Sequence, residues 1–294
     1  MKHSLRATLI LIAIFLSAQI IGLGITNNYI DHEKTAETGE ASFKSLPYDV
    51  ERPQIDESFS FAYIITAIII ATALVFVIMH FKQMTLWKLW FFLAVFMTLT
   101  VAFNAFIGQF AAVILAVVLA LWKVVRPNIY IHNLTEMFIY GGLAAIFVPI
   151  INLFAAFVLL ILISGYDAYA VWKSKHMIKL AKFQTKSKMF AGLLIPYRIP
   201  KKPKKGKGKL VKVKTAVLGG GDIGFPLIFA GVVMKGLMLT NPILIGFLKS
   251  LIIPLTTTVA LGWLLIKAEK DKFYPAMPFL SIGCIVGYLI VLIL

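Results

Sequence analysis

The sequence predicts an all-α, polytopic membrane protein with about nine transmembrane helices. Of its 294 residues, 60% are hydrophobic and only 14% are charged, and the mean hydropathy is +0.89. Soluble domains carry roughly 25% charged residues, so lipid must be the solvent for much of this chain. Cys284 is the only cysteine, which excludes disulfides, zinc knuckles and iron–sulfur clusters within one chain. We therefore expect no metal and no cofactor.

Nine apolar runs are long enough to cross a bilayer. A spanning helix needs roughly 20 mostly apolar residues, because the hydrocarbon core is about 30 Å thick. The runs are Ala7–Gly24, Phe59–Phe81, Leu86–Asn104, Phe106–Leu121, Thr135–Pro149, Asn152–Trp172, Thr215–Met234, Asn241–Ile266 and Pro275–Leu294. A cleaved signal peptide is an alternative for the first run, but its apolar stretch is long and no A-x-A cleavage site follows.

Basic residues gather on one side of these runs. If the N-terminus is cytoplasmic, 24 of the 29 Lys and Arg lie in cytoplasmic segments, fifteen of them from Lys173 to Lys214. The positive-inside rule then places the N-terminus in the cytoplasm and the C-terminus outside, and we expect the cell membrane. The chain divides into residues 1–172 with spans one to six, a basic cytoplasmic loop at 173–214, and residues 215–294 with spans seven to nine. Together they form one membrane domain.

The basic loop is expected to be a solvated linker attracted to anionic lipid headgroups. Its densest part is Lys201–Lys209. No aromatic residues interleave with these lysines and no RNA-binding motif accompanies them, so we expect no nucleic-acid partner. The one apolar stretch within the loop, Phe190–Pro200, is a candidate gate or interfacial anchor.

Three of the thirteen acidic residues lie in or beside apolar runs: Glu136, Asp167 and Asp222. Glu136 is expected at the edge of its span, within reach of water. The two aspartates lie deeper, where a carboxylate costs about 2.5–3.5 kcal/mol on insertion scales. An ionisable residue kept there is a functional candidate. The alternatives are a hydrogen-bonded pair that joins two helices and an ion relay in a transporter.

Asp167 and Asp222 are expected at nearly equal depth on consecutive antiparallel helices. Asp167 lies six residues before Lys173, about 9 Å from the cytoplasmic end of its helix, and Asp222 lies eight residues after Lys214, about 12 Å from the same face. Two carboxylates that meet in a low-dielectric site cannot both be ionised, so they hold one proton between them. Such a pair can hydrolyse a peptide by activating water and protonating the carbonyl oxygen.

Short motifs surround both aspartates. They are Gly165-Tyr166-Asp167-Ala168, Leu218-Gly219-Gly220-Gly221-Asp222 and, at the ninth run, Pro275-Ala276-Met277-Pro278. This set resembles the presenilin and signal peptide peptidase family of GxGD-type intramembrane aspartyl proteases. That family has Tyr-Asp on the sixth span, Gly-x-Gly-Asp on the seventh and Pro-Ala-Leu on the ninth. Met277 replaces the leucine with an apolar residue of similar volume. The resemblance covers nearly the whole chain and implies a presenilin-like bundle, in a prokaryotic homologue of presenilin.

The resemblance implies that Asp167 and Asp222 are catalytic. Each glycine in a helix interior costs about 1 kcal/mol, so three in a row indicate that this stretch is not an ordinary helix and can approach another chain closely. An extended substrate needs hydrogen-bond partners that lipid does not offer. Substrate contacts are therefore expected at Tyr166, Gly219, Gly220, Gly221, Pro275, Ala276, Met277 and Pro278. The alternatives are close helix packing for the glycines, a helix start for the prolines and a bundle position for Tyr166.

The predicted function is thus an aspartic endopeptidase that cuts single-span membrane-protein substrates within the membrane, and an oligomer is compatible with the sequence. The alternative is a proton- or cation-coupled transporter that uses the same carboxylates, although the absence of an internal repeat weakens it. A metalloprotease is excluded because His32-Glu33 lacks the second histidine of H-E-x-x-H. A rhomboid-type serine protease is excluded because Ser164-Gly165 follows Leu162-Ile163 rather than a glycine. Prepilin peptidases share the Gly-x-Gly-Asp motif but are expected to lack the other two motifs.

Overall fold

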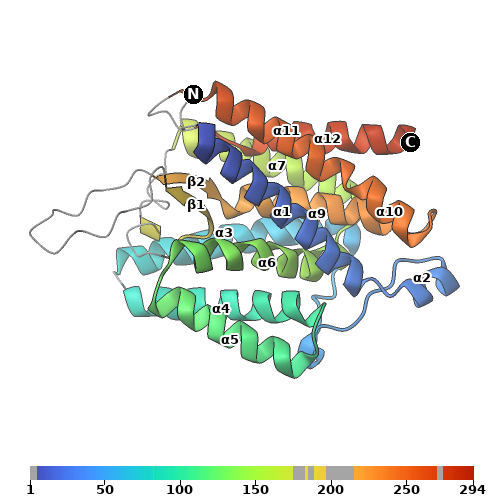
Figure 1. Ribbon diagram of the computed structural model, residues 1–294, viewed down its shortest axis with the longest axis horizontal. Coiled ribbons are helices and arrows are strands. Elements are labelled where there is room, and N and C mark those ends of the chain that lie inside the picture. The colour runs from blue at the N-terminus through green and yellow to red at the C-terminus, as the bar shows by residue number, and fades with distance from the viewer. Residues whose placement is uncertain (1–4, 82, 175–182, 185–188, 197–214, 270–273) are drawn as a thin grey trace, which may run out of the picture.

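Helices make up most of the chain in the computed structural model, which describes residues 5–81, 83–174, 183–184, 189–196, 215–269 and 274–294 (Figure 1). The helices are α1 (Leu5–Tyr29), α2 (His32–Thr38), α3 (Ser60–His80), α4 (Met84–Asn104), α5 (Gln109–Val125), α6 (Ile129–Phe147), α7 (Leu153–Trp172), α9 (Gly220–Leu237), α10 (Ile243–Ser250), α11 (Ile252–Lys267) and α12 (Met277–Ile293). Three short 3-10 turns are η1 (Pro47–Asp49), η2 (Glu57–Phe59) and η3 (Val148–Ile150). The strands β1 (Gly192–Pro196) and β2 (Thr215–Gly219) pair antiparallel.

The predicted all-α, polytopic architecture is confirmed. Within the described residues, seven helical segments are long and apolar enough to cross a membrane, and α5 and α12 are shorter apolar helices of 17 residues each. Together these nine segments match the nine predicted runs. Helices α10 and α11 form one such segment with a break at Leu251. Pro254 explains the break, because it has no N–H to donate to the carbonyl of Ser250.

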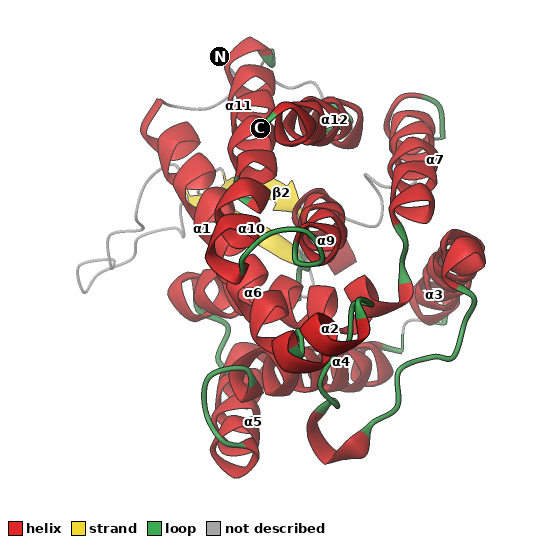
Figure 2. Cartoon of the chain, turned by 90° about the vertical axis from the view of Figure 1, so that its right-hand side faces the viewer, coloured by secondary structure: helices red, strands yellow, loops and turns green. Residues whose placement is uncertain are grey.

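Helix α9 lies inside the bundle and contacts α1, α6, α7, α10, α11 and α12 (Figure 2). Small residues allow these close approaches, as is usual between membrane helices. A Cβ atom on Gly231 of α9 would lie 2.7 Å from Cγ2 of Val148 in η3. Helix α9, which begins at the glycine motif, therefore packs closely against its neighbouring helices, and this packing fixes the position of its first turn.

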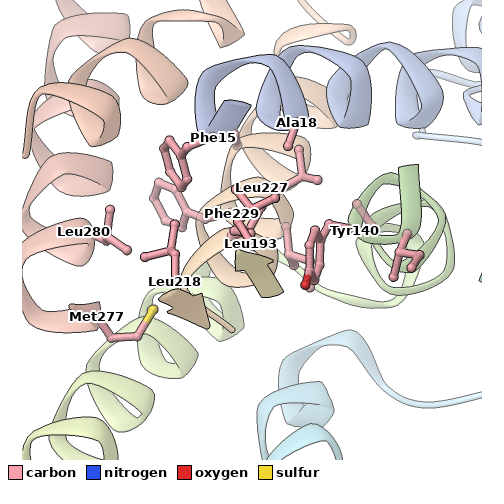
Figure 3. Close-up of a cluster of buried hydrophobic side chains, with 14 of the residues drawn as sticks. Phe15, Ala18, Tyr140, Leu193, Leu218, Leu227, Phe229, Met277 and Leu280 are labelled. Carbon is pink, nitrogen blue, oxygen red and sulfur yellow. The ribbon is translucent and has the colours of Figure 1, made fainter. Parts of the chain in front are cut away.

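The strand pair packs its apolar side chains onto the same core. Leu193 of β1 and Leu218 of β2 are direct partners in the register, and both are buried. Figure 3 shows them beside Leu227 and Phe229 of α9, with Phe15 of α1 nearby. The two strands are thus joined to the helices by hydrophobic packing as well as by their place in the chain.

Two predicted boundaries were wrong. The seventh span does not begin at Thr215, because Thr215–Gly219 forms β2 and the helix starts at Gly220. Pairing with β1 satisfies the main-chain polar groups along one edge of this stretch without a helix. The span predicted from Thr135 instead begins at Ile129, capped by the Asn128 side chain, which accepts the Tyr130 N–H at 2.8 Å.

The basic loop predicted at 173–214 falls largely outside the described residues, and Lys201–Lys209 lies wholly outside them. Within the apolar stretch Phe190–Pro200, residues 192–196 form β1. Residues 192–196 are therefore part of the folded core beside α9 and have a regular structure that hydropathy alone did not indicate.

Candidate active site

Asp167 lies on α7 and faces the start of α12. Its side chain is buried, with the residue only 7% exposed. Its Oδ2 accepts the N–H of Met277 at 3.1 Å, and the main chain of Ala276 also binds this carboxylate. The first amides of a helix have no partner within the helix and carry the positive end of its dipole. The Pro-Ala-Met-Pro motif therefore holds the Asp167 carboxylate through its main chain.

Asp222 lies in the first turn of α9, where an acidic residue is favoured by the free amides and the helix dipole. Its Oδ2 accepts the N–H of Gly219, the residue before the helix, at 3.2 Å. Asp222 is partly accessible, whereas the next residue, Ile223, is fully buried. The glycine motif therefore orients the Asp222 carboxylate through a main-chain N–H, as the Pro-Ala-Met-Pro motif orients Asp167.

The two aspartates belong to helices that pack against each other, α7 and α9. Their carboxylates are near enough to interact electrostatically. Within the described part of the chain, the ion pairs involve other residues, and neither aspartate pairs with Lys or Arg. Two carboxylates without a cation are suited to share a proton. The sequence predicted a shared site for the two aspartates, and the contact between α7 and α9 brings together the helices that carry them.

The other predicted site residues are the three glycines before Asp222, the four residues at the start of α12, and Tyr166. Gly219 and Gly220 are partly exposed and Gly221 is exposed, at the point where β2 passes into α9. Pro275, Ala276 and Met277 are buried and Pro278 is partly buried, at the start of α12. Tyr166 is partly buried and hydrogen-bonds Thr72 of α3, so its hydroxyl points to a neighbouring helix.

One expectation is corrected here, because Glu136 does not lie at a water-accessible edge. The residue is 1% exposed, and its Oε1 lies 2.5 Å from the Nζ atom of Lys123 on α5. Its Oε2 accepts the N–H of Gly192 at 3.0 Å and the O–H of Tyr140. The span begins six residues earlier than predicted, which places Glu136 within the bundle.

The available signal for this cluster was a pair of opposite charges at the facing ends of two neighbouring apolar runs: Lys123 lies two residues after Phe106–Leu121, and Glu136 lies at the start of Thr135–Pro149. Lysine can reach across a helix turn with its long side chain, so the turn between these runs could have brought the two together. Hydropathy instead treated His132 and Asn133 as loop residues. In the structure both are buried and bind the main chain of β1.

Comparison with known proteins identifies the family of this site. The sequence profile described as signal-peptide peptidase, presenilin aspartyl protease matches residues 40–294. No curated protein matches the chain. Among solved structures, a presenilin family intramembrane aspartate protease in space group C222 is similar with a TM-score of 0.64 and 19% identity, covering 97% of this chain and 98% of that one. The P2 crystal form of a presenilin family intramembrane aspartate protease gives a TM-score of 0.62 and 19% identity, with 96% of each chain covered.

At this identity the solved structures establish the shared fold, and the profile, which spans both aspartates and all three motifs, establishes the family. The chain belongs to the signal-peptide peptidase and presenilin family of aspartyl proteases.

Proposed function

We propose that this protein is a GxGD-type intramembrane endopeptidase that cuts single-span membrane proteins with Asp167 and Asp222 as its two catalytic residues. The observation that carries the proposal is the pairing of these carboxylates. They lie on packed helices, interact with each other, and form no ion pair within the described chain. A membrane protein that keeps two such groups together gains chemistry rather than stability from them.

The proposed reaction uses one proton held by the pair. The ionised aspartate takes a proton from water while the water oxygen bonds to the peptide carbonyl carbon. The protonated aspartate donates its proton to the carbonyl oxygen, which gives a gem-diol. The carbon–nitrogen bond then breaks as the amide nitrogen receives a proton from the aspartate that took one from water. The other aspartate takes a proton back from a gem-diol hydroxyl, which leaves the acid and amine products and restores the single shared proton. Oδ2 of each carboxylate accepts a main-chain N–H, and Oδ1 is the oxygen proposed for these transfers.

The free edge of β2 is the proposed place for an extended substrate. Gly192 opposes Gly219 and Leu194 opposes Val217, and the main chains of Gly192 and Leu194 point away from β2 toward α6. Antiparallel pairing alternates the direction of main-chain groups, so the Val217 N–H and C=O point to the edge opposite β1. Val217 is 43% exposed. A strand added there would find hydrogen-bond partners that lipid does not offer, directly before Asp222.

The charge distribution supports an orientation for this site. We propose that the protein lies in the cell membrane with its N-terminus on the cytoplasmic side. The aspartates then lie toward the cytoplasmic leaflet, and the basic loop meets anionic lipid headgroups. Substrates would have their N-terminus outside. We propose no nucleic-acid partner, and homo-oligomers are compatible with the site because it is built from one chain. Protease accessibility of tags at both termini in sealed vesicles tests the orientation, and a cytoplasmic C-terminus would overturn it.

Purified protein in liposomes with a fluorescent single-span peptide tests the proposed activity. Cleavage is expected for the wild type, with loss in both Asp167→Asn and Asp222→Asn and inhibition by a hydroxyl-containing transition-state mimic. Lys34→Ala, at an exposed pair with Asp31 on α2, is the matched control and should cleave normally. Proton or cation flux without peptide cleavage would instead establish the transporter alternative.

A further inference from the structure

A buried ion pair joins α5 to α6 beside the strand pair. The Lys123 and Glu136 side chains are each 2% exposed, and the Lys123 Nζ atom also donates to the Thr135 hydroxyl at 2.8 Å. Removing two charges from water is costly even when they pair. The pair is not part of the proposed chemistry, so its place in the fold calls for a separate explanation.

The ion pair is connected to β1 through the second oxygen of Glu136. That oxygen accepts the N–H of Gly192 at 3.0 Å and the O–H of Tyr140. Gly192 has φ +140°, in the region that favours glycine, and a Cβ atom there would lie 2.6 Å from Cε1 of Phe190. Glycine is therefore required where the strand meets this carboxylate.

Side chains of α6 occupy the outer edge of β1 as a neighbouring strand would. His132 Nε2 lies 2.7 Å from the carbonyl oxygen of Gly192, and because a carbonyl only accepts, Nε2 carries the hydrogen. The Asn133 side chain donates to the Leu194 carbonyl at 2.9 Å and accepts the Leu194 N–H at 3.0 Å. The main-chain groups of Gly192 and Leu194 are thus paired at this edge, so β1 is fixed to α6 and, of the two described strands, β2 has the edge that another chain could join.

The connection continues from β1 to the catalytic residue. Gly192 lies opposite Gly219 in the register, and Gly219 donates its N–H to Asp222. Tyr140 provides a second contact near Asp222. Its ring packs on Gly220, where a Cβ atom would lie 2.6 Å from the Tyr140 hydroxyl oxygen. Glu136 therefore contacts the β1 residue that lies opposite the last residue of β2, and Tyr140 contacts the first residue of α9.

We propose that Glu136, held by Lys123, is a positioning residue that sets where β2 and Asp222 lie relative to the substrate and so selects the peptide bond that is cut. It acts through Gly192 and Tyr140 and does not touch the reacting atoms. The inference rests on the proposed function, since it concerns the fidelity of that cleavage. A purely structural ion pair would affect the amount of folded protein but not the position of the cut.

Two matched double variants separate these roles. Lys123→Met with Glu136→Gln removes both charges and keeps a side-chain oxygen to accept the Gly192 N–H. Lys123→Met with Glu136→Leu removes both charges and the acceptor at similar volume. Neither leaves a buried charge unpaired, which is the usual reason for misfolding at such a site. Cleavage of the single-span peptide is followed for kcat, KM and the masses of the products.

The Gln variant is expected to cut at the wild-type position with kcat within about threefold. The Leu variant is expected to lose about 100-fold in kcat at an unchanged KM, and to cut at several neighbouring bonds. Wild-type products and kcat in the Leu variant would overturn the proposal, and so would a Gln variant with the same defects as the Leu variant. If the Leu variant does not fold, Tyr140→Phe replaces it. That change removes one donor to Glu136 and keeps the ring, and unaltered product ratios would then overturn the proposal.

Hydrogen exchange measured by mass spectrometry provides a readout that does not need activity. In the Leu variant, the peptides that contain residues 192–196 and 215–219 should exchange about tenfold faster than in the wild type and the Gln variant. Exchange rates in the Leu variant equal to those of the wild type would contradict the positioning role of Glu136, independently of any cleavage result. Failure of the wild type to cleave any single-span peptide would contradict the proposed function instead, so the two failures are distinguishable.

Discussion

Two groups of carboxylates lie inside this bundle, and they are partnered in opposite ways. Glu136 has a lysine, a tyrosine hydroxyl and a main-chain N–H as partners. Asp167 and Asp222 each accept a main-chain N–H, and the two carboxylates influence each other electrostatically. Within the described residues, neither aspartate forms an ion pair with a basic side chain.

This difference in partners is the basis for proposing a positioning role for Glu136 and a catalytic role for the two aspartates. A carboxylate with a buried cation is held as an ion, and its geometry is fixed by several hydrogen bonds. A carboxylate beside another carboxylate is left to share a proton, which is what acid and base chemistry needs. The comparison predicts that changes at Glu136 and its partners affect stability as well as the position of the cut, whereas changes at the aspartates affect activity alone.

The largest loss of stability is expected for Lys123→Met. It leaves the Glu136 carboxylate buried without its cation, and breaking a buried pair in this way costs about 3–5 kcal/mol. Denaturant unfolding in detergent, followed by helical circular dichroism, measures the change. Lys123→Met with Glu136→Gln should recover most of the loss. A single variant as stable as the wild type would show that the pair is not an anchor.

A smaller loss is expected where the anchor meets the catalytic turn. Gly220→Ala places a Cβ atom 2.6 Å from the Tyr140 hydroxyl oxygen, and overpacking of this kind costs about 1–3 kcal/mol. Gly221→Ala is the matched control, because its Cβ would meet Phe225 no closer than 3.4 Å. The same unfolding measurement compares them. Equal stability of the two variants would mean that Tyr140 does not restrain the start of α9.

At the other end of α9, Lys235→Met should lower the free energy of unfolding by about 1 kcal/mol. Lys235 pairs with Glu57 at 3.3 Å, but the Glu57 side chain is 48% exposed and can be solvated when the lysine is removed. The change in thermal midpoint relative to Lys123→Met measures the difference. A loss as large as that of Lys123→Met would mean that burial of the carboxylate does not decide the cost.

The smallest effect on stability is expected at the catalytic pair. Asp167→Asn and Asp222→Asn each remove a carboxylate that has no cation, and the amide oxygen can still accept the Met277 or Gly219 N–H. Both variants should therefore unfold at the wild-type denaturant concentration although their cleavage is lost. Failure of either to assemble would favour the alternative in which the aspartates only join two helices.

Much of this arrangement could be predicted from the sequence. The sixth span was expected at Asn152–Trp172 and is found at Leu153–Trp172, because bilayer thickness and a run of apolar residues together set both ends of such a helix. The sequence also predicted a shared site for the two aspartates, from their similar distance to the basic loop, and the helices that carry them, α7 and α9, are in contact. The motifs at Gly219–Gly221 and Pro275–Pro278 lie beside them, where spacing along consecutive spans would place them.

The strand pair could not be predicted in the same way. Thr215–Gly219 is an apolar run of five residues that continues into a helix, and periodicity does not separate a short buried strand from a helix start. Its partner, Gly192–Pro196, lies on the far side of a long basic segment. Glu136 was misplaced for a related reason. Hydropathy scores His132 and Asn133 as polar, whether they bind water or the edge of a strand.

The most direct test of the central claim is the initial rate of peptide cleavage by four reconstituted proteins. They are the wild type, Asp167→Asn, Asp222→Asn and the variant with both changes. If the two carboxylates work as one unit, each single variant loses as much activity as the double variant, because neither aspartate can complete the proton transfers alone. A single variant that keeps more than about a tenth of the wild-type rate would contradict the account.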